Sequence, residues 1–481
     1  MKRYTTFIAA LLVITQLAAC GETQHDQTET TTAGDTEPVT TDVFEGIGDK
    51  TYDGREFNFL IRETEIDDYF IEAETGDVLD DAVYKRNRMV EDRFDIEINP
   101  IKIDASWNAR STYIGTMRNS VMSGSGEYDL IDGYAAVIGD GFADHLFLNL
   151  HDVPNLRLDE AWWSSLVESE LTVNGKLYAM TGDLAINMWS NLFALYFNKQ
   201  TVEEFKRESP YDLVKSGKWT LAALLSQIKD TAQDIDGDGK MTPDDKWGLL
   251  VYDTLWYDNM HNALGVSMSK KDKSGQVSYD FQNEKLIEIY EKILALANDN
   301  PDSHFMDQST TDIIPTTRAI FTSGRAMYFG DTLVACTAMR DSDIEFGILP
   351  LPKYDEKQDG YHTASRDGRS MFVIPTDVKD VEFVGRITEA LAVASHEYVI
   401  PAYYEVTLKT KTARDDDSSE MLDIIRSGFT LDFAAEYAMQ TGQGGYMIRN
   451  ALSSGQPYAS FLASNINAYE TGLEEFLKAY E

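Results

Sequence analysis

Apolar residues recur with a period of two in some segments of the chain and with a helical period in others. Residues 56–61 alternate and then run apolar after Asp53-Gly54, which predicts a strand. Residues 80–94 predict a helix, and residues 96–101 predict the next strand. The same reasoning predicts strands at 128–131, 247–251 and 326–329, and helices at 220–230, with Thr220 as N-cap, and at 285–297. This alternation of strands and helices is typical of an α/β fold.

The first twenty residues have the pattern of a secretion signal. Lys2 and Arg3 precede an apolar run at residues 7–14, which is too short to span a membrane by itself. The following Leu17-Ala18-Ala19-Cys20 resembles the bacterial lipobox, whose Cys is lipidated and becomes the mature N-terminus. We therefore expect a signal peptide at 1–19 and a lipid anchor, palmitate included, on Cys20. A plain signal peptide that ends by chance in Cys remains the alternative.

A polar stretch follows the expected anchor. Residues 21–44 consist mainly of Thr, Glu, Asp, Gln and Gly, which bury too little surface to offset the entropy of ordering. We expect residues 20–49 to be a disordered linker that lets a folded body reach a partner in the membrane. Cys336 is then the only other Cys, so no intramolecular disulfide is expected.

The composition narrows the functional classes. The 481 residues are 43% hydrophobic and 26% charged, which is typical of a globular protein. Lys and Arg number 42 against 81 Asp and Glu, for a net charge of -39. Such an acidic chain is not expected to bind nucleic acid, whose phosphates require basic surface. The charge favours a soluble and self-repelling protein, so we expect a monomer.

Several short passages resemble one protein family. They are Asn174-Gly175-Lys176-Leu177-Tyr178, Leu195-Tyr196-Phe197-Asn198-Lys199, Lys218-Trp219-Thr220, Phe321-Thr322-Ser323-Gly324-Arg325-Ala326-Met327 and Phe346-Gly347-Ile348-Leu349-Pro350. In this order, over about residues 55–375, they resemble the extracellular solute-binding proteins that serve ABC importers, the maltodextrin-type sugar binders among them. The segment from Ile400 to Glu481 matches no general pattern of that family.

The resemblance implies a fold and a mode of action. It implies the two-lobe, type II periplasmic-binding-protein-like α/β fold, with the ligand in a cleft between lobes that close about a hinge. On this analogy the first lobe takes residues 50–192 and 374–405, and the second takes 193–373 and 406–481. The expected function is capture of a carbohydrate, an oligosaccharide first, and its delivery to ABC permease subunits, without catalysis and with the lipid as the sole membrane attachment.

Residues 234–245 contain the pattern D-x-D-x-D-G of a calcium loop. Gly239 would supply the sharp turn, and closure by Asp at the twelfth position, in place of Glu, predicts a weak structural site suited to extracellular calcium. A solvated acidic turn without metal is the alternative. The expected oxygen ligands are Asp234, Asp236, Asp238, the Lys240 carbonyl, Thr242 and Asp245.

Sugar-binding sites pair flat aromatic rings with a few polar groups, and open α/β sheets place ligands at the carboxyl ends of their strands. Residues near predicted strand ends, or near the expected crossover, are therefore our candidates for the cleft. Trp189 and Trp256 are candidates for stacking, although each could equally be a packing residue. The other candidates are Arg62, Tyr134, Asp183, Tyr257 and Asp331.

Other functions leave weaker signals. The chain has no Gly-x-Ser-x-Gly elbow, no His-Glu-x-x-His and no phosphate loop, and its seven His residues show no ligand spacing. A pair of carboxylates for glycoside hydrolysis would arise by chance among 81 acids, so a secreted hydrolase stays an alternative. A surface adhesin is another. Within the binding class, a peptide or acidic sugar is the alternative ligand, with Arg62, Arg366 and Arg369 as carboxylate partners.

Overall fold

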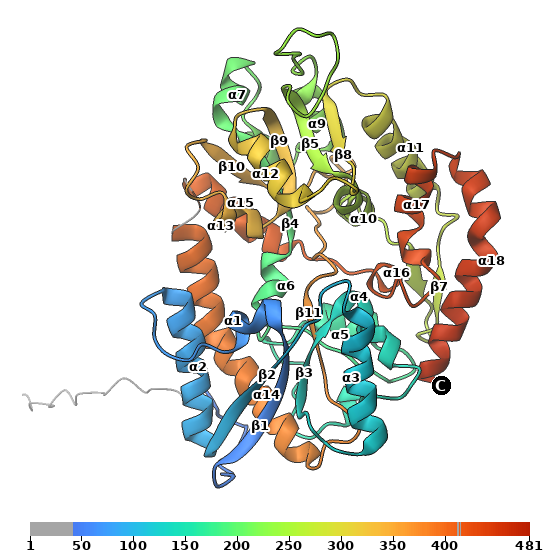
Figure 1. Ribbon diagram of the computed structural model, residues 1–481. Helices are drawn as coiled ribbons and strands as arrows, with labels where there is room; N and C mark the ends of the chain where they lie inside the picture. The colour runs from blue at the N-terminus through green and yellow to red at the C-terminus, as the bar shows by residue number, and fades with distance from the viewer. Residues whose placement is uncertain (1–41, 411–412, 414) are drawn as a thin grey trace, which may run out of the picture. The chain divides into compact units, whose positions relative to one another are not determined.

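Two separate sheets organise the chain, one in the lower and one in the upper half of Figure 1. The computed structural model describes residues 42–410, 413 and 415–481. The expected signal peptide, the expected lipid attachment site Cys20 and most of the expected linker lie outside these residues. Residues 43–481 form one unit of internal contacts.

The first lobe is built on a four-stranded sheet with the strand order β11-β3-β1-β2. The strands β1, β2 and β3 are parallel, and β11 runs antiparallel to β3. The strands are β1 Arg55–Arg62, β2 Ile96–Ile103, β3 Leu130–Tyr134 and β11 Ser370–Val373. The helices of this part are η1 Glu63–Glu65, α1 Ile66–Tyr69, α2 Val78–Phe94, α3 Arg110–Ser123, α4 Ala135–Ile138, η2 Gly139–Gly141, η3 Leu150–Asp152, α5 Ser165–Leu171 and α14 Val381–Ala394.

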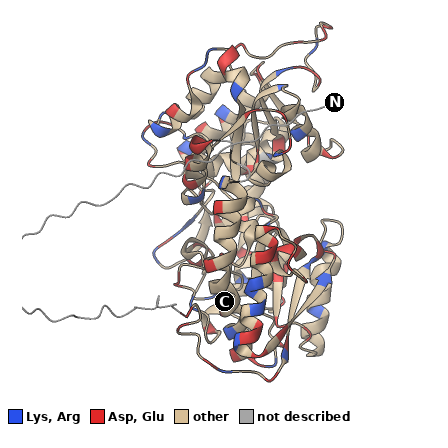
Figure 2. Ribbon diagram, turned by 90° about the vertical axis from the view of Figure 1, so that its left-hand side faces the viewer, with Lys and Arg blue, Asp and Glu red and all other residues tan. Residues whose placement is uncertain are grey.

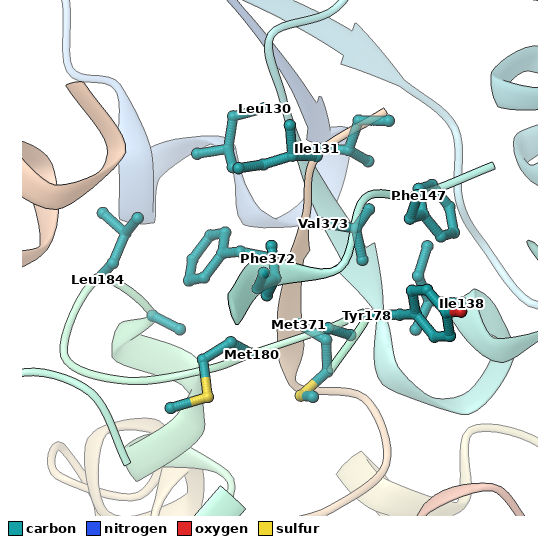
Figure 3. Packing of buried hydrophobic residues seen from close by; sticks show 14 of the residues in the cluster. Leu130, Ile131, Ile138, Phe147, Tyr178, Met180, Leu184, Met371, Phe372 and Val373 are labelled. Carbon is teal, nitrogen blue, oxygen red and sulfur yellow. The ribbon is translucent and has the colours of Figure 1, made fainter. Parts of the chain in front are cut away.

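Apolar side chains from β3 and β11 meet in the core of the first lobe (Figure 3). Leu130 and Ile131 lie beside Phe372 and Val373 because the two strands pair side by side. Burial of these apolar side chains, on both faces of the sheet, is the main stabilising contribution to it. The pairing also places residues 370–373 in the first lobe, whereas the sequence assigned them to the second.

The second lobe is built on a five-stranded sheet with the order β10-β4-β9-β5-β8. The strands β8, β5 and β9 are parallel, while β4 is antiparallel to both of its neighbours. The strands are β4 Phe193–Asn198, β5 Trp247–Tyr252, β8 Ser303–Met306, β9 Ala326–Thr332 and β10 Phe346–Leu349, and a separate hairpin pairs β6 Ser269–Lys271 with β7 Val277–Tyr279. The helices are α7 Lys199–Glu204, α8 Pro210–Lys215, α9 Leu221–Ile228, α10 Asp253–Ala263, α11 Glu284–Asn298, α12 Ile313–Thr322 and α13 Val334–Ala338.

The C-terminal helices contact both lobes. Helix α18 packs against α11 and α17, as the right-hand side of Figure 1 shows. At the chain end, Phe476 and Tyr480 enter the first core, where both rings contact Phe142. The segment whose lobe the sequence could not place thus joins the two halves. Its elements are α15 Asp416–Ser427, α16 Phe433–Glu436, η6 Gly444–Tyr446, α17 Met447–Ser454, α18 Tyr458–Leu477 and η7 Lys478–Tyr480.

Three extended segments cross between the lobes side by side. The segment after α6 (Ile186–Ser190) pairs Leu192 with Ser365, and the second crossover pairs Thr363 with Phe429 of the third. A helical rod runs beside them, because α14 continues into the π-helical segments η4 (Ser395–Val399) and η5 (Ala402–Thr410). Its first half packs in the first core and its last residues pack with second-lobe strands, so the rod spans both lobes.

The predicted elements are confirmed with small changes of boundary. Helix α2 starts at Val78, and the Thr220 hydroxyl accepts a hydrogen bond from the Ala223 amide at 3.2 Å, as expected of an N-cap. The expected linker requires a correction. Phe44 and Ile47, two apolar residues at the end of the polar stretch, are buried in the first core. The folded body therefore begins by residue 43. The other lobe boundaries stay predictions.

Candidate functional site

A cavity of about 550 Å³ lies between the two lobes. Tyr134 ends β3 of the first sheet and Tyr252 ends β5 of the second, and both line this cavity. The C-terminal segment supplies a further wall through Tyr446 and Arg449. The carboxyl ends of parallel strands from both sheets therefore face a shared space, which is where open α/β sheets hold ligands.

A smaller polar chamber of about 60 Å³ adjoins this cavity. Four residues line both spaces: Asp258, Arg366, Asp367 and Tyr446. We call this shared boundary the mouth of the chamber. The chamber walls beyond this mouth come from α10, from the crossover before β11 and from α16. We call the larger space the cleft and the smaller one the chamber.

Aromatic side chains line the cleft on several sides. Trp107 stands in the loop after β2 with 48% of its surface exposed, and the Arg110 guanidinium lies 4.3 Å from the centre of its ring. Tyr134 lies below the Arg62 guanidinium, and burial raises the pKa of its phenol. Arg449 stacks on Tyr446 at 3.7 Å. These rings offer flat apolar faces beside polar groups, which suits ligands with CH faces and hydroxyls.

Charged groups in the cleft are only partly paired. The Arg449 guanidinium donates to Asp258 Oδ2 at 2.8 Å. Burial raises the pKa of Asp258 to about 7, with the neighbouring Asp367 adding to the effect and Arg449 opposing it. Tyr446 donates to Asp367 at 3.4 Å, while the Arg366 guanidinium makes no ion pair or hydrogen bond with the described residues. The cleft therefore presents one free guanidinium and carboxylates that can accept from a ligand.

Arg62 is at the predicted strand end but is buried, with 4% of its surface exposed. Its guanidinium donates to Asp132, to the Gly368 carbonyl and to the Ser370 hydroxyl at 2.7–3.0 Å. Asp132 in turn lies inside the first sheet. The side chain thus links β1 to β11 beneath the cleft, and Tyr134 stands between it and the cavity edge.

Asp183 and Trp189 lie together at the crossover instead of in the cleft. The Trp189 indole donates to Asp183 Oδ1 at 2.8 Å, and the Arg426 guanidinium lies 4.6 Å from the centre of its ring. His396 Nδ1 shares a hydrogen bond with the other Asp183 oxygen, and this bond raises the pKa of His396. The cluster joins the first crossover to the helical rod and to α15, a structural role.

The remaining candidates lie under the cleft floor. Trp256 and Tyr257 are buried on α10, which begins directly after β5, and Tyr257 stacks on Phe305 with ring centres 5.6 Å apart. Asp331 accepts from the Arg318 guanidinium at 2.7 Å in a mostly buried ion pair. Trp256 and Asp331 line a void of about 10 Å³, too small for a ligand. Of the seven candidates, the structure brings Tyr134 to the cleft.

The arginines expected as partners of an acidic ligand do not all lie in the cleft. Arg366 lines both cleft and chamber, whereas Arg369 is buried in an ion pair with Glu436. Burial lowers the pKa of Arg369 to about 10. Sequence reasoning missed Trp107, Tyr252 and Arg449. Tyr252 could have been found as the residue directly after the predicted strand 247–251, but the other two have no local signal.

The acidic loop brings three carboxylates together. One oxygen each from Asp234, Asp236 and Asp245 lies within 4.8 Å of the others. Asp234 accepts from the Gly239 amide at 2.7 Å, and Gly239 has a φ of +81°, which a side chain would strain. These backbone hydrogen bonds lower the pKa of Asp234. The carboxylate oxygens are hard donors, the kind that calcium prefers, so these residues fit the ion.

The Asp238 carboxylate, also expected as a ligand, is not part of this group of three. The Asp238 carboxylate accepts from the Lys240 amide at 2.7 Å. The Thr242 hydroxyl donates to Asp245 at 3.1 Å. They flank the cluster of three.

Comparison with known proteins places this geometry in a class. No protein-family model matches the chain, and no curated protein matches its sequence. A cyclo/maltodextrin-binding protein in complex with maltotetraose matches at TM-score 0.56 with 14% identity, over 88% of this chain and 97% of the other. The GacH receptor of Streptomyces glaucescens, determined unliganded and with acarbose, matches at 0.55 with 13% identity, over 87% and 99%. Maltose-bound T. maritima MalE3 matches at 0.53 with 15% identity, over 88% and 99%.

The chain therefore has the two-lobed α/β fold of the solute-binding proteins, as the sequence predicted. Matches at this identity establish the fold. In the part of the chain that the structure describes, every helix is too short or too polar to cross a bilayer. Lys and Arg are interspersed with Asp and Glu on both lobes in the view of Figure 2.

Proposed function

We propose that the protein is an extracellular solute-binding protein that captures a carbohydrate, first of all an oligosaccharide. The observation that carries this proposal is the cleft itself, where Trp107, Tyr134 and Tyr446 surround a polar space of about 550 Å³ at the strand ends of two lobes. The volume is within the range of small-molecule sites. The solved structures of the same fold named above hold maltotetraose, acarbose and maltose.

The mechanism is closure of the lobes around the sugar. Trp107 and Tyr134 belong to the first lobe and Tyr252 to the second, so a ligand that touches both sides favours the form in which they are close. Its differential affinity for that form drives the population shift. The three paired crossovers permit rotation, because extended segments absorb changes of φ and ψ without loss of the core.

Delivery to ABC permease subunits and attachment through lipidated Cys20 complete the proposal. They are supported by the lipobox-like Leu17-Ala18-Ala19-Cys20 and by the family to which the sequence motifs point. Metabolic labelling with a palmitate analogue, with Cys20→Ala as control, tests the anchor. Label on the variant, or none on the native chain, would refute it.

The test of ligand class is calorimetry on residues 21–481 with a panel of neutral oligosaccharides, acidic sugars and short peptides. We expect binding of a neutral oligosaccharide and no new reducing ends after prolonged incubation. Peptide binding without carbohydrate binding would overturn the proposal, and release of reducing ends would establish the hydrolase instead. Binding to insoluble polymer alone would favour the adhesin.

An acidic sugar is the second candidate, and Arg366 favours it. Its guanidinium lines the cleft without an ion pair among the described residues, and a carboxylate would satisfy it. Tighter binding of a uronic acid than of its neutral parent would support this candidate, provided that Arg366→Gln removes the difference.

We also propose that the loop of Asp234, Asp236 and Asp245 binds calcium as a structural ion. Excess calcium should raise the melting temperature of the chelator-treated protein, because an ion that binds the folded state stabilises it by mass action. Asp234→Asn should remove this response, whereas Asp244→Asn, outside the cluster, should keep it. Identical melting with and without calcium would refute the proposal.

A further inference from the structure

The chamber beside the cleft contains buried polar atoms that have no partner. Arg369 and Glu436, 2% and 6% exposed, pair with each other at its wall. Arg369 Nε and Glu436 Oε1 nevertheless lack a hydrogen bond within the described residues. At the chamber mouth, Asp258 Oδ1 is likewise buried and unpartnered there. Since buried polar groups are almost always satisfied, these atoms show that the chamber wall holds polar groups unsatisfied by the described residues.

The size of the chamber limits what can occupy it. A volume of about 60 Å³ is room for a few water molecules. A pyranose ring with its hydroxyls is far larger, so a sugar ring stays in the cleft. The four shared residues at the mouth let a ring in the cleft direct one small substituent inward.

The charge of the chamber limits the occupant further. Its lining carboxylates are Asp258, Asp367, Asp432 and Glu436, against the two guanidinium groups of Arg366 and Arg369. This balance disfavours an anionic substituent. A hydroxyl can donate to Glu436 and accept from Arg369, whereas a methyl group would leave both unsatisfied.

We propose that the chamber receives the hydroxymethyl group of a hexopyranose, and that it thereby selects hexose units over pentose, 6-deoxy and uronic acid units. This inference rests on the proposed carbohydrate function and names the substrate class of that site. Arg369 and Glu436 are the specificity-determining pair, and Asp258 contacts the substituent at the mouth.

The test uses sugars that differ only in the group on C5. Titration calorimetry uses three series. The first compares D-glucose with D-xylose, D-quinovose and D-glucuronic acid. The second compares D-galactose with L-arabinose, D-fucose and D-galacturonic acid, and the third compares cellobiose with xylobiose. We expect the hexose member of a recognised series to bind about tenfold to hundredfold more tightly, because its analogues leave buried polar groups unpaired. Equal affinities within a recognised series would overturn the inference and leave the proposed function intact. Binding of no sugar would overturn both.

A pair of chain variants keeps the test independent of the ligand series. Ala435→Leu adds bulk to the chamber wall and should lower hexose affinity to the pentose level while pentose affinity stays unchanged. Ser453→Leu adds the same bulk to the cleft alone and should change both affinities by equal factors. A crystal structure with the tightest-binding hexose sugar should place its primary hydroxyl beside Glu436. Water in the chamber, with the hydroxymethyl group outside, would overturn the inference even if the variants fail to fold.

Discussion

Trp107 gives the sharpest test of the proposed cleft. It lies in the loop after β2 and lines the cavity, yet 48% of its surface is exposed, unusually much for so large an apolar side chain. Trp107→Ala removes the ring from the cleft wall. Its stacking partner Arg110 lies on the next helix, α3, so the change leaves the sheet and core in place.

The exposed fraction sets the expected magnitude. A Trp side chain buries about 200 Å² when fully covered, so 48% exposure leaves about 100 Å² for a ligand to cover. At about 25 cal/mol per Å², full coverage is worth about 2.5 kcal/mol, and coverage of one ring face about half of that. Because about 1.4 kcal/mol corresponds to a tenfold change, Trp107→Ala should weaken binding roughly eightfold to sixtyfold.

The assay is calorimetry with the tightest oligosaccharide of the panel, with melting temperature as the measure of folding. Met122→Ala is the matched control, because Met122 is 78% exposed on α3 and does not line the cleft. The control should bind like the native chain. If Trp107→Ala binds within twofold of the native chain at an unchanged melting temperature, the sugar does not use this wall and the reasoning is refuted.

Three other predictions concern buried groups. Arg318→Met should lower the free energy of unfolding by about 3 kcal/mol in urea titrations, because it leaves Asp331 buried without its cation. Adding Asp331→Leu should recover most of this loss. If Arg318→Met causes no loss of stability, the ion pair is not structural. Burial raises the pKa of Asp258 to about 7, so its contribution to stability is fully present below pH 4 and is lost as the pH rises through 7. Thermal melts should show this slope in the native chain and not in Asp258→Asn. Gly445→Ala would place Cβ 1.9 Å from the Ala434 carbonyl oxygen and should cost at least about 1–3 kcal/mol, which an unchanged melting temperature would contradict.

The strands and helices were predictable because their signal is local, whereas the two-lobe arrangement was implied by the resemblance of the motifs. The apolar periodicity that predicts β1 and α2 is set by residues a few positions apart, and burial follows the same periods. The errors of the lobe boundary came from contacts between distant residues. Residues 370–373 join the first sheet by pairing with β3, which lies more than two hundred residues earlier. The pattern of neither strand predicts which strand it pairs with.

The candidate site shows where the reasoning from strand ends fails. Tyr252 and Trp256 are four residues apart after the same predicted strand, but Tyr252 ends β5 at the cleft while Trp256 is carried under the floor by the first turn of α10. A helix that begins directly at a strand end reverses the direction of the side chains that follow. The sequence predicted that β5 ends here and did not predict this helix.

The cleft also explains why an acidic chain can still present guanidinium groups to a ligand. Arg366 comes from a crossover and Arg449 from the C-terminal segment, while Asp258 comes from α10. The net charge sets the electric field over the whole surface, and salt screens this field within about a Debye length. A hydrogen bond in the cleft depends only on the few groups that meet there. The paired groups Arg449 and Asp258 are 191 residues apart in the sequence. The proposed preference for a neutral polar ligand therefore depends on these partly paired groups and not on the net charge of the chain.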